Sequence, residues 1–217
     1  MEKICILSDF DGTITVKDSL YNFFEQFAPP KWLEIEQLWE DGIIDSKECL
    51  VKEFQLIPKL TSEFLDNYLD TVTIDEFFFE FYKYIKQSKI DFYIVSDGVD
   101  YFIKKILENN NLKGLHIISN HAEFIDENFE LTFPNSQTNC KKNSGTCKCA
   151  VLNKFKNDYD KIIYIGDGTS DFCVAPNTDI LFAKKKLENY CQKNNIDFVS
   201  YTNFGDVINF LKKRTLL

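Results

Sequence analysis

Arginine is almost absent from this chain. Of 217 residues only Arg214 is an arginine, and lysine and arginine together number 25 against 34 aspartates and glutamates, for a net charge of −9. Binding to nucleic acid depends on Lys and Arg neutralising backbone phosphates, so this composition excludes a nucleic-acid partner. A small anionic ligand is still allowed, because one cation and a few backbone N–H groups can make the potential positive inside a cleft.

Long apolar runs are missing as well. No stretch reaches the roughly 18 apolar residues that cross a bilayer, and the first residues lack the length and the small-residue cleavage site of a signal peptide. We therefore expect a cytoplasmic protein with no membrane partner, acting as a monomer or a homodimer on a small molecule.

The seven cysteines contain no C-x-x-C pair and are odd in number, which excludes a secreted disulfide framework. Cys140, Cys147 and Cys149 are clustered, but His116 and His121 have no ligand-like spacing that would complete a zinc site. Reduced thiols are the expectation, and a redox or metal role for the three clustered cysteines stays open.

Short apolar runs rich in Ile, Val, Tyr and Phe predict buried strands. They cover residues 4–8, 92–95, 162–165, 180–182 and 198–201. Helical patterns lie between them, the clearest of them on Val99, Phe102, Ile103, Ile106 and Leu107. Strands that alternate with helices predict an α/β fold: a Rossmann-like parallel sheet with helices on both faces.

Residues 18–72 break this alternation. The segment is aromatic and helix-patterned with no convincing strand, so we predict a small inserted helical cap on a core of residues 1–17 and 73–217. The alternative is a pair of core helices. A capping box from Thr73 to Glu76 predicts the start of the next core helix, and residues 121–133 have the alternation of a β-hairpin around residues 126–128.

Three of the predicted strands end in acid and glycine: Asp9-Phe10-Asp11-Gly12, Ser96-Asp97-Gly98 and Gly166-Asp167-Gly168. An Asp-Gly pair alone is a common turn, as at Asp41-Gly42. In doubly wound sheets, however, ligands bind in the crevice at the carboxyl ends of the strands, so three such ends can form one site.

Clustered carboxylates suit Mg²⁺, which prefers oxygen ligands and is held by one or two carboxylates plus phosphate oxygens. Asp9 and Asp167 are the natural side-chain ligands. The Ser96 hydroxyl and the backbone N–H groups of Asp97 and Gly98 could hold phosphoryl oxygens. A carboxylate that attacks a phosphate also needs a cation to offset their repulsion, and a lysine would supply it.

These segments resemble the motifs of haloacid dehalogenase superfamily phosphatases, subfamily IB. Asp9-Phe10-Asp11-Gly12-Thr13 resembles the first motif, Ser96 the second, and Gly166-Asp167-Gly168-Thr169-Ser170-Asp171 the fourth. The resemblance implies a Mg²⁺-dependent phosphatase with Asp9 as nucleophile and Asp11 as general acid and base. Asp11 would also bind the metal through its carbonyl, Asp167 would bind it directly, and Asp171 would support it from beside the site.

The family's third motif supplies a lysine that binds both the nucleophile and the phosphate. Lys148 is identified as this residue, with Lys154 and Lys161 as alternatives. An acid role for Asp11 requires a raised pKa, since a free aspartate titrates near 3.9. Crowding by other carboxylates and loss of water are the available causes.

The Gly-Thr-Cys-Lys element around Lys148 is similar to that of methionine-salvage phosphatases, which act on a methylthio-ketopentane phosphate. Phosphoserine phosphatases are also similar, but their cap arginine has no counterpart here. Substrate-binding candidates are Asp18, Tyr21 and Phe24. Phosphoserine, phosphocholine or phosphoethanolamine hydrolysis and phosphoryl transfer to an alcohol stay open. A signalling receiver domain is disfavoured by the length of the chain and by Asp11.

Overall fold

The computed structural model describes residues 2–125, 128–140 and 142–213. Its centre is a seven-stranded sheet with the order β4-β3-β2-β1-β5-β6-β7, in which only the β3–β4 pair is antiparallel. The strands are β1 (Ile4–Ser8), β2 (Asp91–Val99), β3 (His116–Ile125), β4 (Asn128–Thr132), β5 (Lys161–Gly166), β6 (Ile180–Ala183) and β7 (Val199–Ser200).

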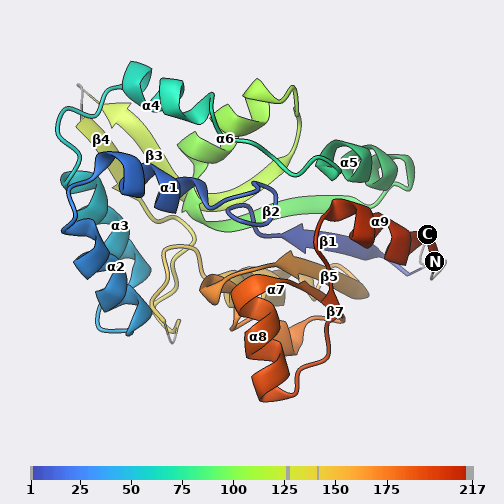
Figure 1. The fold of residues 1–217 in the computed structure, drawn as a ribbon. Helices are drawn as coiled ribbons and strands as arrows, with labels where there is room; N and C mark the ends of the chain where they lie inside the picture. Colours follow the sequence, from blue (N-terminus) through green and yellow to red (C-terminus); the bar gives the residue numbers. More distant parts are fainter. Residues whose placement is uncertain (1, 126–127, 141, 214–217) are drawn as a thin grey trace.

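Helices cover both faces of this sheet (Figure 1). On one face lie α5 (Phe78–Gln87), α6 (Asp100–Asn109) and α9 (Phe204–Lys213), and on the other α7 (Lys148–Phe155) and α8 (Lys185–Asn194). Alternate residues of β1 face the two helical layers. Ile6 packs with the layer of α5, α6 and α9, whereas Cys5 and Leu7 pack with the layer of α7 and α8. The predicted α/β fold with helices on both faces is confirmed.

The strand order places a switch point at β1. From β1 the chain builds β2 and β3 on one side, then returns to build β5 and β6 on the other. Ligands bind at such a point, outside the carboxyl ends of the strands. The ends of β1, β2 and β5, which carry the acid-and-glycine segments, are therefore neighbours.

Four helices lie between β1 and α5: α1 (Ser19–Phe27), α2 (Trp32–Glu40), α3 (Ser46–Gln55) and α4 (Ser62–Leu69). The chain leaves and re-enters the core at one neck, where Thr15 bridges to Ile74 and the Val16 N–H donates to the Thr73 carbonyl at 3.1 Å. These helices pack through aromatic side chains: Phe23 contacts Phe54 from within this segment and Phe102 from α6.

One detail of the sequence-based prediction is wrong and another is confirmed. The capping box at Thr73 is wrong, because residues 73 and 74 are held in the neck and α5 begins only at Phe78, without a side-chain cap. The hairpin is present as the pairing of β3 with β4, from His121 opposite Thr132 to Ile125 opposite Asn128. The predicted turn at residues 126–127 lies outside the described residues.

Among the described residues, no helix combines the length and the apolar character that crossing a membrane requires.

Phe102 joins α6 to the aromatic helices of the 18–72 segment and is fully buried. We predict that Phe102→Ala lowers the free energy of unfolding by about 3–5 kcal/mol, because it removes a large buried ring and leaves a cavity. Urea unfolding monitored by circular dichroism measures the loss. Phe79→Ala on α5 is the control, since Phe79 is 58% exposed, and it should cost less than about 0.5 kcal/mol. Equal losses would contradict the assignment of Phe102 to the core.

Candidate active site

The carboxylates of Asp9, Asp167 and Asp171 converge at the carboxyl ends of β1 and β5. Asp9 follows β1, and its N–H donates to the Ile165 carbonyl of β5 at 2.9 Å. One oxygen from each of the three carboxylates lies within 4.8 Å of the others, and all three residues are buried. The structure thus brings together Asp9 and Asp167, predicted as metal ligands, with Asp171, predicted to stand beside them.

Lys148, the first residue of α7, lies inside this acidic group. Its Nζ is 2.8 Å from Asp9 Oδ2 and 2.7 Å from Asp171 Oδ1, and only 2% of the residue is exposed. Burial opposes its charged form, but the carboxylates of Asp171 and Asp9 outweigh this effect and raise the pKa of Lys148 above its ordinary value. The two lysines predicted as alternatives to Lys148 lie outside this acidic group. Lys154 is exposed, and Lys161 pairs with Glu2 at 3.1 Å.

Asp171 fixes the loop that follows β5. Besides Lys148, its carboxylate accepts hydrogen bonds from the Tyr164 hydroxyl at 2.6 Å and from the backbone N–H groups of Asp167 and Gly168 at 3.0 and 3.1 Å. These donors satisfy a buried carboxylate that would otherwise be costly. Asp171 therefore holds both Lys148 and Asp167 in position.

The acidic group carries more negative charge than Lys148 offsets. Burial and the charge of Asp171 raise the pKa of Asp9 well above its ordinary value, and Asp167 adds to the effect. Carboxylate oxygens at this separation form the donor set that a hard divalent cation such as Mg²⁺ prefers. The residues therefore fit a divalent metal ion.

The Asp11 carboxylate is bound to the start of α1, outside the group of Asp9, Asp167 and Asp171. Its carboxylate accepts hydrogen bonds from the Ser19 N–H at 3.0 Å and from the Ser19 hydroxyl. Burial and the charge of Asp18 raise the pKa of Asp11 to about 7. This shift has the direction that an acid role requires, and the two causes are those expected from the sequence.

Ser96 and Asp97, near the end of β2, have different hydrogen-bond partners. Ser96 is buried, and its hydroxyl accepts from the Gly98 N–H at 3.0 Å. The Asp97 carboxylate turns to the other side, where it accepts from the Thr146 N–H at 2.8 Å and from the Asn120 amide at 3.3 Å. Any phosphate contact at Asp97 therefore falls to its backbone N–H, while its side chain positions the segment before Lys148.

Three residues that complete the site were missed in the sequence. Thr13 Oγ1 donates to Asp167 Oδ1 at 2.9 Å, and Lys185 Nζ donates to Asp167 Oδ2 at 3.0 Å and to the Gly12 carbonyl at 2.8 Å. Tyr164 was read only as a strand residue. Lys185 lies two residues after the end of β6, at the edge of the sheet where Asp9 and Asp167 lie.

A cavity of about 610 Å³ lies between the strand ends and the helices α1, α2 and α3 of the 18–72 segment. This volume is in the range of small-molecule sites. Asp9, Ser96 and Asp167 line its floor, and all three predicted substrate residues line its other side. Asp18 also caps α1 by accepting from the Tyr21 N–H at 2.9 Å, Tyr21 packs edge-on against Trp32, and Phe24 is buried.

All seven cysteines are free thiols in the structure. Cys147 and Cys149 flank Lys148, and hydrogen bonding from Cys149 lowers the pKa of Cys173 to about 7. No grouping of metal-ligating atoms among the described residues includes Cys140, Cys147 or Cys149.

The relatives described below identify the chain as a phosphoric monoester hydrolase, and its fold is shared by a solved haloacid dehalogenase family hydrolase. Residues 4–198 match the model of a family described as Putative Phosphatase, and the chain belongs to this family.

Similar proteins carry consistent names. The chain is 30% identical over 209 residues to a 2-hydroxy-3-keto-5-methylthiopentenyl-1-phosphate phosphatase of an Exiguobacterium species, covering 95% of this chain and 96% of that protein. It is 31% identical over 211 residues to a Bacillus cereus protein of the same name, covering 96% of each.

Two solved structures share the fold at a TM-score of 0.72. One is a phospho-aspartyl intermediate analogue of phosphoserine phosphatase, with 19% identity and coverage of 96% of this chain and 98% of that one. The other is a haloacid dehalogenase family hydrolase from Salmonella enterica serovar Typhi, with 18% identity and coverage of 94% and 69%.

We predict that Lys148→Met lowers the free energy of unfolding by about 3–5 kcal/mol, because it leaves buried carboxylates without their cation. The loss should be smaller at mildly acidic pH than at neutral pH. The raised pKa of Asp9 means that the folded state gains protons first as the pH falls, and each proton removes part of the repulsion.

Urea unfolding with a chelator present at both pH values tests this. Lys154→Met is the matched control, since Lys154 is an exposed lysine on the same helix. If both variants unfold at the same urea concentration, Lys148 does not hold the acidic group together.

Proposed function

We propose that this protein is a Mg²⁺-dependent phosphatase that hydrolyses a small phosphate monoester through an aspartyl-phosphate on Asp9. The observation that carries the proposal is the Asp9 carboxylate, which lines the cavity and is held 2.8 Å from the buried ammonium of Lys148. Asp9, Asp167 and the Asp11 carbonyl would hold Mg²⁺. When bound, the ion would neutralise the carboxylates and the phosphoryl oxygens.

In the first step an Asp9 oxygen attacks phosphorus and the ester P–O bond breaks. Asp11, protonated at its raised pKa of about 7, gives its proton to the leaving oxygen. The Ser96 hydroxyl, the backbone N–H groups of Asp97 and Gly98, and Lys148 would hold the phosphoryl oxygens. In the second step Asp11 takes a proton from a water molecule that attacks phosphorus, which releases inorganic phosphate and restores Asp9.

We infer that residues 18–72 act as a cap over this reaction, on a core of residues 1–17 and 73–217. The cap supplies Tyr21, Phe24 and Trp32 to the cavity wall. An apolar wall suits the methylthio tail of the ester for which the relatives are named, and that ester is the first specific substrate to test.

Phosphoserine is less well matched. The described residues contain no arginine to clamp a carboxylate in two-pronged fashion, and Arg214 lies outside them. Phosphoryl transfer to an alcohol would use the same Asp9 intermediate, and product analysis with added alcohol distinguishes it from hydrolysis.

We predict that Asp9→Asn abolishes phosphate release from p-nitrophenyl phosphate in the presence of Mg²⁺, because the amide cannot form the phosphoenzyme. Circular dichroism should show an intact fold. Asp41→Asn is the control, since Asp41 is exposed outside the cavity, and it should retain full activity. Turnover by Asp9→Asn would remove the mechanism.

Asp11→Asn should act differently, because p-nitrophenolate leaves without needing a proton. We predict that Asp9 is still phosphorylated but that its hydrolysis slows by about 100- to 10,000-fold, the range of general acid–base contributions. A burst of p-nitrophenol followed by a slow steady rate, with phosphorylated protein seen by mass spectrometry after acid quench, measures this. A normal steady rate would show that Asp11 is not the base.

A further inference from the structure

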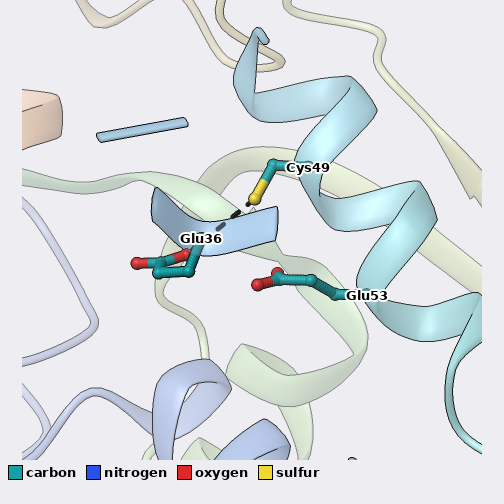
Figure 2. A group of neighbouring side chains, drawn as sticks. All are labelled: Glu36, Cys49 and Glu53. Carbon is teal, nitrogen blue, oxygen red and sulfur yellow. Dashed lines mark hydrogen bonds between the residues drawn. The ribbon is translucent and has the colours of Figure 1, made fainter. Parts of the chain in front are cut away.

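A second buried acidic group lies in the cap side of the cavity, away from Asp9. Figure 2 shows Glu36 on α2 facing Cys49 and Glu53 on α3. One ligand atom from each residue lies within 4.8 Å of the others, and the Cys49 thiol donates to Glu36 Oε2 at 3.8 Å. All three residues line the cavity. Two carboxyl groups therefore meet where the leaving group of a substrate would lie.

One oxygen of this group has no hydrogen-bond partner. Glu53 is 3% exposed, and among the described residues nothing donates to its Oε1. A buried polar atom left unsatisfied costs about 1–3 kcal/mol, and more when it is charged. Since Glu53 lines the cavity, a ligand there can supply the missing donor.

The protein supplies no cation to this pair within the described chain. Two lysines line the same cavity, but Lys185 is bound to Asp167 and Lys186 pairs with Glu40 at 2.6 Å. Neither Glu36 nor Glu53 has an ion pair with a described lysine or histidine. Burial and neighbouring carboxylates accordingly raise the pKa of Glu36 to about 7 and that of Glu53 to about 9.

We propose that Glu36 and Glu53 bind a primary ammonium group on the leaving group of the substrate, so that the enzyme selects aminoalkyl phosphates. This inference rests on the proposed function for the reaction itself. An ammonium supplies the charge that the carboxyl pair lacks and an N–H for Glu53 Oε1, forming a charge-assisted hydrogen bond. Trp32 and Phe24 line the same cavity and supply apolar surface for the methylene chain.

The same geometry ranks other leaving groups. A quaternary ammonium has the charge but no N–H, so Glu53 Oε1 stays without a donor. An uncharged methylthio chain brings neither a positive charge nor an N–H to the pair, so Glu53 Oε1 again stays without a donor. A leaving group that carries its own carboxylate, as phosphoserine does, brings a third negative charge to the pair.

The test compares kcat/KM for aminoethyl, aminopropyl and aminobutyl phosphates with that for the alkyl phosphate in which a methyl group replaces each ammonium. For the best chain length we expect the amine to be preferred by roughly 10- to 100-fold, as for a hydrogen bond to a charged group. Phosphocholine and the methylthio ester should fall below the aminoalkyl phosphate of best length.

Glu53→Gln and Glu36→Gln should each remove most of this preference, so that the ratio of kcat/KM for the amine to kcat/KM for the alkyl ester falls toward one. Glu48→Gln is the matched control, because Glu48 is an exposed α3 residue paired with Lys52, and it should keep the preference. A preference that survives in both cap variants would overturn the proposal even if one of them folded poorly.

Failure of the inference is distinguishable from failure of the proposed function. Equal turnover of amines and alkyl esters would overturn ammonium binding but leave an active phosphatase, whereas no turnover of any ester would overturn the reaction itself. A metal ion found on Glu36, Cys49 and Glu53 in purified protein would also overturn the inference, because the pair would then already be neutralised.

Discussion

The buried contact of Lys148 with Asp9 and Asp171 is the interaction on which the rest of the site depends. An ammonium and carboxylates taken out of water are stable only when each is paired with good geometry, so the start of α7 must lie at the ends of β1 and β5. The chain before α7 is held accordingly: the Thr146 N–H binds Asp97 at the end of β2, and the Cys147 N–H binds the Asn135 carbonyl. One charge cluster thus ties together segments that are about 140 residues apart in sequence.

The two ends of the cavity favour ligand groups of opposite charge. At the floor, Lys148 and the proposed site for a divalent cation would allow a phosphate to bind a protein of net charge −9. At the cap, Asp18, Glu36 and Glu53 line the wall, and Asp18 raises the pKa of both Asp11 and Glu36 through its charge. Asp18 therefore couples Asp11, the proposed acid–base residue, to Glu36. A substrate with a negative and a positive end matches this gradient along its length.

The parts of the fold and the site that could be predicted from the sequence are those formed by short continuous segments. The segments at Asp9, Ser96 and Asp167 each combine a short apolar strand with polar residues at its end, and the parallel fold brings such ends together. The first part of β3 was missed, because residues 116–120 mix His, Ser and Asn with two isoleucines and are recognisable as a strand only through pairing with β2. Lys185 was missed for a related reason. Its contact with Asp167 depends on β6 lying beside β5, which a run of lysines does not reveal.

The position of one cap carboxyl group could have been noticed in the sequence. Glu36 and Glu53 are 17 residues apart on different helices, so no motif links them. Glu53, however, lies on the apolar face of α3, four residues after Cys49 and next to Phe54, all buried. A carboxylate there is expensive unless something neutralises it. An acidic residue on the inner face of a cap helix is thus a physical sign of ligand binding, because helix packing alone would place an apolar side chain at that position.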